Sequence, residues 1–185
     1  SCLTFPIFKT DGQLGEIYGR RVGSRHGSPD HLYLPGPHQG IFNQQVLGHD
    51  SPLILCESII DALTLWVHDF RHVTASFGAG GFTEEMFHLI EERQVKTIWI
   101  AYDNDEGGNH QADVLAQRLV TAGLEVDRVL LSKGADINSF ALVQENPKEA
   151  LQELLEQRFS YNAQLQPLPS NSPTPGKSNA PIWDG

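Results

Sequence analysis

The stretch IWIAYDNDEGGNHQADVLAQRL, residues 98–119, combines the signals that indicate the class of fold. Its first residues are apolar and suit a strand that is buried on both faces of a sheet. The apolar run stops at Asp103 and Asp105, whose side chains point the same way in an extended backbone. Gly107 and Gly108 then precede a helical pattern. We therefore expect a strand end, a close approach of backbone to a ligand, and a helix N-terminus in succession.

Strand-like and helix-like segments alternate from residue 53 to about residue 145. Such alternation predicts an α/β fold, with a doubly wound parallel sheet sandwiched by helices. In the first helix, apolar residues at helical spacing predict one buried face, formed by Ile59, Ala62, Leu63, Trp66 and Val67. The expected strands are 53–56, 72–78, 96–102 and 124–131, and the expected helices are 58–70, 83–93, 109–123, 136–144 and 147–159.

Composition divides the chain into three parts. Residues 1–50 are rich in β and turn signals, with Asp11-Gly12 as a hairpin turn, and predict a small β-rich N-terminal subdomain. Residues 51–159 carry the α/β pattern. Residues 160–185 are rich in Pro, Ser and Asn, which predicts a linker or a disordered tail.

Length and charge limit the classes of function. A chain of 185 residues can bury one core, and no apolar run approaches the roughly 20 residues of a membrane span. The absence of an initiator Met and of a signal peptide indicates a fragment of a longer, cytoplasmic protein. Cys2 and Cys56 are expected to be small core residues in a reducing compartment. A net charge of −10 argues against a surface that binds phosphates without a cation.

Carboxylates follow three of the predicted strands. Glu57 comes after the first strand, with Asp61 one helical turn further on; Asp103 and Asp105 follow the third, and Asp136 follows the fourth. Ligand sites in open α/β sheets form at the carboxyl ends of strands, so these acids are expected to meet. Oxygen ligands without clustered Cys or His favour Mg²⁺ or Mn²⁺. A D-x-D that stands alone after a strand is more often a solvated turn with a helix N-cap than a metal site, and it is the acids at the other two strand ends that favour the metal site here.

Other motifs fit less well. An EF-hand loop that starts at Asp103 would need ligands where Gly107 and Val114 stand. The glycine-rich segment that follows the second strand has Thr83 where a dinucleotide fingerprint needs its last glycine. A response-regulator receiver, with acids at two strand ends and a late lysine such as Lys133, stays open as an alternative.

Several segments, in the correct order, resemble the TOPRIM domain of bacterial DNA primases. TOPRIM domains also occur in type IA and type II topoisomerases and in OLD-type nucleases. LILCESIIDALTLW (53–66) resembles V-E-G-x-x-D-x-x-x-L, AYDNDEGG (101–108) resembles D-G-D-x-A-G, and KGADINSF (133–140) resembles the late D-P-D segment. Upstream, residues 5–22 and 31–43 resemble the small subdomain that precedes TOPRIM in primases.

The resemblance implies roles for particular residues. Glu57, Asp103 and Asp105 would be catalytic, and they would hold Mg²⁺ (or Mn²⁺) together with Asp61 and Asp136. Arg21, with Arg20 beside it, would face nucleotide or DNA, and Lys133 is a further candidate for nucleotide or DNA binding. These roles belong to metal-dependent synthesis of RNA primers from ribonucleoside triphosphates on a single-stranded DNA template.

Some residues depart from the primase pattern. Ser58 stands where primases have glycine, Asn138 replaces the second late Asp, and Gln44 and Gln45 replace a Lys-Gly pair. With these departures, the chain resembles the primase-like proteins of plasmids, phages and mobile elements. The partners of such proteins include a helicase or helicase domain. The departures also leave open a TOPRIM nuclease that cleaves DNA, and a non-catalytic nucleic-acid-binding module of a mobile-element protein.

Overall fold

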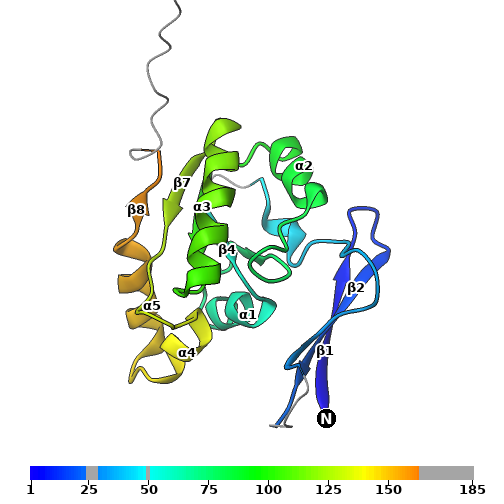
Figure 1. The fold of residues 1–185 in the computed structure, drawn as a ribbon, viewed down its shortest axis with the longest axis horizontal. Coiled ribbons are helices and arrows are strands. Elements are labelled where there is room, and N and C mark those ends of the chain that lie inside the picture. Colours follow the sequence, from blue (N-terminus) through cyan, green and yellow to red (C-terminus); the bar gives the residue numbers. More distant parts are fainter. Residues whose placement is uncertain (24–28, 49–50, 163–185) are drawn as a thin grey trace, which may run out of the picture.

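A computed structural model describes residues 1–23, 29–48 and 51–162, which form a small antiparallel sheet beside a larger, mainly parallel one (Figure 1). The strands in these ranges are β1 (Cys2–Phe8), β2 (Leu14–Arg21), β3 (His31–Leu32), β4 (Leu53–Cys56), β5 (Val73–Ala75), β6 (Thr97–Ala101), β7 (Glu125–Arg128) and β8 (Phe159–Ser160). The helices are η1 (Gln44–Val46, a 3-10 turn), α1 (Ile59–Val67), α2 (Glu84–Glu92), α3 (Glu106–Thr121), α4 (Ile137–Leu142) and α5 (Pro147–Glu156).

The larger sheet has the strand order β5-β4-β6-β7-β8. The first four of these strands are parallel and β8 is antiparallel to β7, so the predicted α/β class is confirmed. After β4 the chain crosses to β5 on one side and later returns to β6 on the other. Ligand sites in such sheets lie at this reversal, outside the carboxyl ends of the two central strands.

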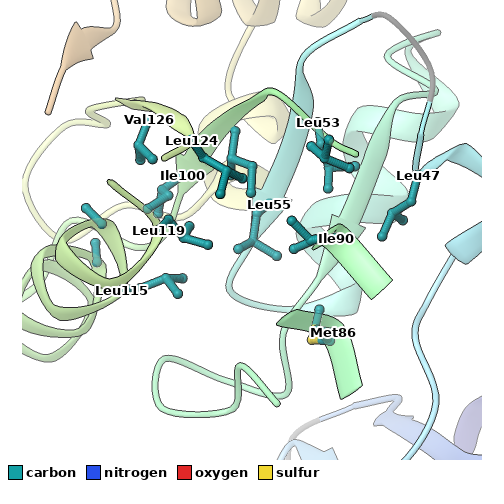
Figure 2. Close-up of a cluster of buried hydrophobic side chains, with 14 of the residues drawn as sticks. Leu47, Leu53, Leu55, Met86, Ile90, Ile100, Leu115, Leu119, Leu124 and Val126 are labelled. Carbon is teal, nitrogen blue, oxygen red and sulfur yellow. The ribbon is translucent and has the colours of Figure 1, made fainter. Parts of the chain in front are cut away.

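Helices cover both faces of this sheet. The apolar side chains of α2 and α3 pack on one face, against alternate residues of β4 and β6 such as Leu55 and Ile100 (Figure 2). Helices α1, α4 and α5 pack on the other face, against residues such as Ile54 and Cys56. Because β4 is buried on both faces, all four of its residues are apolar, as the uninterrupted run LILC predicted.

Two predictions about burial are wrong. On α1, Trp66 is 41% and Val67 is 61% exposed, whereas Leu65 is buried. The buried stripe is rotated because α1 also packs against α4, which covers Asp61 and Thr64 rather than the end of the helix. Cys2 is exposed on β1, so only Cys56 is a core cysteine.

Helix α3 begins earlier than predicted. The expected start was residue 109, after Gly107 and Gly108, but both glycines lie in the first turn of the helix. The reason is the cap: Asp105 accepts a hydrogen bond from the backbone N–H of Gly108 at 2.7 Å, which satisfies a donor that a helix start leaves free.

The larger sheet ends beyond the position where the tail was predicted to begin. Ser160 is part of β8 and pairs with β7. Tyr161 is buried and donates a hydrogen bond to Asp113 at 2.6 Å, and Asn162 accepts one from the backbone N–H of Val126 at 2.7 Å. A short strand and two side chains therefore close this sheet edge. The rest of the predicted tail lies outside the described residues.

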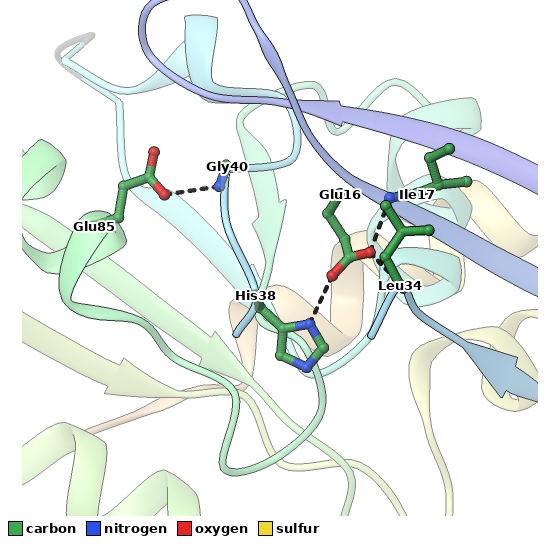
Figure 3. Close-up of polar contacts among 6 residues, drawn as sticks. All are labelled: Glu16, Ile17, Leu34, His38, Gly40 and Glu85. Atoms are coloured by element: carbon green, nitrogen blue, oxygen red, sulfur yellow. Dashed lines mark hydrogen bonds and ion pairs between the residues drawn. The ribbon is translucent and has the colours of Figure 1, made fainter. Parts of the chain in front are cut away.

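The N-terminal hairpin turns at Asp11-Gly12 as predicted, with Gly12 at a φ of 81°. The loop before η1 joins it to the main body (Figure 3). Glu16 of β2 is 1% exposed and accepts from His38 Nδ1 at 2.9 Å, and the His38 ring stacks on Phe77 with centroids 4.5 Å apart. On the same side, Glu85 of α2 accepts a hydrogen bond from the backbone of the loop before η1.

No helix within the described ranges has both the length and the apolar character needed to cross a membrane.

Candidate functional site

Glu57 and Asp103 follow the two central strands, β4 and β6, at the same edge of the sheet. The backbone N–H of Asp103 points to Glu57 Oε2 across 3.4 Å. Both side chains belong to partly buried residues, so the structure brings together the two acids that the strand-end argument placed side by side.

The crowding of negative charge at this edge of the sheet contributes to raised pKa values of Asp103 and Glu57. Burial, and then the nearby charges of Glu57, Asp61, Asp136 and Asp105, raise the pKa of Asp103 to about 8. Burial also raises the pKa of Glu57, against the lowering effect of the Asp103 N–H. The predicted acids therefore lie within electrostatic reach of one another, and a cation or a proton is needed to offset them.

Asp61 is almost fully buried, with 3% of its surface exposed. Its carboxylate accepts hydrogen bonds from Ser58 Oγ at 2.5 Å and from the backbone N–H of Asn138 at 3.0 Å. The Asn138 side chain turns away to donate to Thr64 at 2.8 Å. Asp61 thus connects α1 to the start of α4, and its role as a metal ligand stays a prediction.

Asp105 and Asp136 both cap helices. Asp105 caps α3, and Asp136 caps α4 through a reciprocal pair of hydrogen bonds with Ser139. These are the contacts that the turn-and-cap interpretation expects. The caps also fix both carboxylates at the edge of the sheet near Asp103, so the two interpretations are compatible at these positions.

Asn104 was not singled out from the sequence, yet it braces the loop between the two acids. Its side chain donates to Leu131 O at 2.6 Å and accepts from Asn109 at 2.8 Å. Its backbone exchanges hydrogen bonds with Ala135 and Gly134 in the turn before α4. The signal available in the sequence was a side-chain amide between two aspartates, a residue type that bonds readily to turn backbone.

Of the predicted basic residues, Arg20 takes part in a hydrogen-bond network with His31 and Tyr18. Its Nη1 donates to His31 Nε2 at 2.6 Å, so the other ring nitrogen carries the hydrogen and donates to Tyr18 Oη at 3.0 Å. Burial and the neighbouring Arg20 charge lower the pKa of His31, while the charges of Asp30 and then Asp136 act in the opposite direction. His31 of the small sheet therefore lies within electrostatic reach of Asp136.

The other two predicted basic residues, Arg21 and Lys133, lie outside this network. Arg21 Nε donates to the carbonyl of Pro29 at 3.1 Å, which anchors its side chain beside the end of β2. Lys133 is exposed in the turn between β7 and α4, next to Gly134, which bonds to the Asn104 carbonyl.

The acidic side chains are oxygen donors that suit a divalent cation, but they are not arranged as a complete metal site. In the part of the chain that the structure describes, no group of three or more His, Cys, Asp or Glu side chains is arranged to hold a metal ion. Carboxylate oxygens without Cys or His are the kind of ligand that Mg²⁺ or Mn²⁺ prefers, and a bound cation would offset the negative charges that contribute to the raised pKa of Asp103.

The raised pKa of Asp103 predicts how the metal-free protein responds to pH. Unfolding returns Asp103 to a pKa of about 3.9, so between about pH 4 and pH 8 the folded state binds more protons than the unfolded state. The free energy of unfolding should therefore fall as pH rises through this window. Urea denaturation in EDTA at pH 5 and pH 8 measures it. Asp103→Asn should flatten the dependence, and an equally steep dependence in that variant would contradict the assignment.

Comparison with known proteins gives a consistent result. A family model described as Toprim-like matches residues 54–141. The DNA primase of Aquifex aeolicus (strain VF5) is 32% identical over 164 residues, which cover 83% of this chain and 32% of the relative. The chain thus spans about a third of that curated protein.

Solved structures agree on the fold. The crystal structure of the Aquifex aeolicus primase (zinc-binding and RNA polymerase domains) matches with a TM-score of 0.73 and 25% identity, over 88% of this chain and 41% of the other. A primase catalytic domain bound to single-stranded DNA matches with a TM-score of 0.69 and 22% identity, over 86% of this chain and 53% of the other. By sequence and by fold, the chain is therefore identified as carrying the TOPRIM domain of the DNA primase family.

Proposed function

We propose that this chain is the catalytic core of a primase-like nucleotidyltransferase, which joins ribonucleotides into RNA primers on a single-stranded DNA template. The observation that carries the proposal is the meeting of Glu57 and Asp103 at the carboxyl ends of two central strands, with a pKa of about 8 for Asp103. A divalent cation bound between these acids would offset their repulsion and would serve the phosphoryl transfer of primer synthesis. The similarity to DNA primases supports the choice of reaction.

The residues that would hold Mg²⁺ or Mn²⁺ are Glu57, Asp103, Asp105 and Asp136, with Asp61 fixing α1 against α4. The bound cation would stabilise negative charge on the attacking and leaving oxygens. The raised pKa favours the protonated carboxyl of Asp103 at neutral pH, and a bound cation would favour release of that proton. Glu57, which follows β4, would accept a proton from the primer 3′-hydroxyl.

The small sheet would hold the nucleic acid. Arg20 and Arg21 are the last two residues of β2 and point to opposite faces of the small sheet, and guanidinium groups suit phosphate recognition. Lys133, exposed beside the Asn104 loop, would add a phosphate contact. The plasmid, phage or mobile-element origin, the cytoplasmic location and a helicase partner stay predictions.

The test is primer synthesis on single-stranded DNA with labelled ribonucleotides and Mg²⁺ or Mn²⁺, using this chain and the longer protein. Primers that disappear in Glu57→Gln would support the proposal. Degradation of the template without triphosphates, also lost in Glu57→Gln, would replace it with a DNA-cleaving enzyme. Binding of DNA that survives Glu57→Gln, with neither reaction from this chain or from the longer protein, would replace it with a binding module.

The proposed phosphate contact predicts a change in DNA affinity. Arg21→Gln should weaken the binding of single-stranded DNA, because one phosphate contact is lost. For the same reason, the slope of log K against the logarithm of the salt concentration should become shallower by about one. Fluorescence anisotropy over a salt series measures both quantities. Arg118→Gln, which removes an arginine paired with Glu84 on the surface, is the matched control and should leave the slope unchanged. An unchanged slope in Arg21→Gln would remove Arg21 from the binding surface.

A further inference from the structure

A buried arginine lies directly behind the acidic site. Arg128, the last residue of β7, is 1% exposed and is the largest fully buried side chain in the described part of the chain. Burying a guanidinium is costly unless its donors are satisfied. The position therefore needs an explanation beyond the filling of space.

The guanidinium of Arg128 donates hydrogen bonds to four oxygens, none of which is a carboxylate. Nη1 donates to the carbonyls of Ile100 at 3.2 Å and Tyr102 at 2.8 Å. Nη2 donates to the carbonyl of Asp103 at 3.1 Å and to Asn109 Oδ1 at 3.0 Å. One side chain thus holds the end of β6, the backbone of the acidic residue and the first turns of α3.

These contacts fix the segment that carries the acids. Asn109 also donates to Asn104, so the loop from Asp103 to the start of α3 is tied at both ends to the same guanidinium. The backbone of Asp103 in turn faces the Glu57 carboxylate. A shift of the Asp103 carbonyl would therefore move both acids.

Charge gives Arg128 a second effect on the same segment. Arginine stays protonated in proteins, so its positive charge is permanent. Glu57 and Asp103 lie near enough to influence it electrostatically. The guanidinium thus lowers the cost of holding carboxylates together before a cation binds, without occupying the oxygens that a cation would use.

We propose that Arg128 is a positioning residue of the carboxylate site: its hydrogen-bonding fork holds the Asp103 loop and the start of α3 in the arrangement that binds the cation. The metal-binding part of this inference rests on the proposed function, whereas the ordering of the loop does not. The sequence contained a signal, since Arg128 interrupts the apolar pattern of a strand in a buried sheet, but its partners are distant in the chain.

Two variants separate the effect of the hydrogen-bonding fork of Arg128 from the effect of its positive charge. Arg128→Lys keeps the charge but loses the planar fork, and Arg128→Met loses both at similar length. Arg118→Met, which removes a surface arginine from α3, is the matched control. Hydrogen exchange of the metal-free protein would be followed in peptides covering residues 100–112, and Mn²⁺ affinity would be measured by electron paramagnetic resonance.

In folded Arg128→Lys and Arg128→Met we expect exchange in residues 100–112 to be about tenfold faster, with no change in β1 and β2. The Mn²⁺ dissociation constant should rise about 10- to 100-fold, as for other groups that support metal ligands. Arg118→Met should match the wild type in both measurements. Wild-type exchange and affinity in Arg128→Lys would overturn the proposal, because charge alone would then suffice.

Asn109→Ala keeps the proposal testable if both Arg128 variants fail to fold. It leaves the guanidinium and its three carbonyl contacts, and it removes both the hydrogen bond from the guanidinium to α3 and the hydrogen bond from Asn109 to Asn104. Faster exchange in residues 103–112 is expected, and wild-type exchange would overturn the proposal. If the wild-type protein binds no Mn²⁺, the proposed function fails at its metal site, and the exchange measurements still decide whether Arg128 orders the loop.

Discussion

Asp103→Asn is expected to reduce primer synthesis about 100- to 1,000-fold, because a cation ligand contributes several kcal/mol to stabilising the transition state. Asparagine has nearly the same shape but keeps only one carbonyl oxygen and no negative charge. The same change relieves repulsion with Glu57, so the metal-free variant should be at least as stable as the wild type at pH 8. Primer yield and urea denaturation, measured on one preparation, test both parts.

The opposite signs of the two effects make this variant informative. A loss of activity caused by misfolding would lower both quantities together. Glu92→Gln removes an exposed negative charge at the end of α2 and is the control for net charge, with wild-type values expected throughout. Primer synthesis within about threefold of the wild type in Asp103→Asn would exclude Asp103 as a metal ligand.

Gly108→Ala is expected to destabilise the protein by about 1–3 kcal/mol, the range for overpacking. In an ordinary helix the same change would stabilise by about 0.5–1 kcal/mol. Here the added Cβ would clash with the Asp103 carbonyl oxygen and would lie 3.1 Å from Glu57 Oε2. Backbone must move to accept it, and that movement displaces both acids. Stability in urea denaturation and Mn²⁺ affinity should therefore both be lowered.

Gly107→Ala is the matched control, one residue earlier in the same turn. Its added Cβ would meet only Asp105 Oδ1 at 3.5 Å, an ordinary contact. We expect this variant to keep its Mn²⁺ affinity and to gain about 0.5–1 kcal/mol from helix propensity. If Gly108→Ala behaved like Gly107→Ala, the close packing between α3 and the acidic loop would be disproved.

The sequence alone was sufficient to predict the four parallel strands of the large sheet and the helices between them, but not β8. The run LILC, the Thr83 cap of α2 and Pro147 at the start of α5 are local signals, and the structure has each of them where it was expected. Acids that follow strands could be placed at one edge of the sheet because parallel strands share their carboxyl edge. This inference needed only the alternation of strands and helices.

Which side chains are buried, and which groups they bond to, depends on contacts between distant parts of the chain. Only the tertiary structure decided these features. The packing of α4 on α1 rotated the buried face of α1 toward Leu65 and gave Asp61 its hydrogen bond from Asn138. The pairing of β8 with β7 drew Ser160 into the sheet.

The sequence by itself determined that carboxylates gather at the ends of parallel strands, because side-chain type and strand period are local properties. Only the tertiary structure decided which groups hold those carboxylates in place. Arg128 lies 25 residues from Asp103 in the chain, yet its guanidinium donates to the Asp103 carbonyl. A buried charge of this kind is stable only when folding supplies oxygens for its donors, and no local pattern records where those oxygens come from.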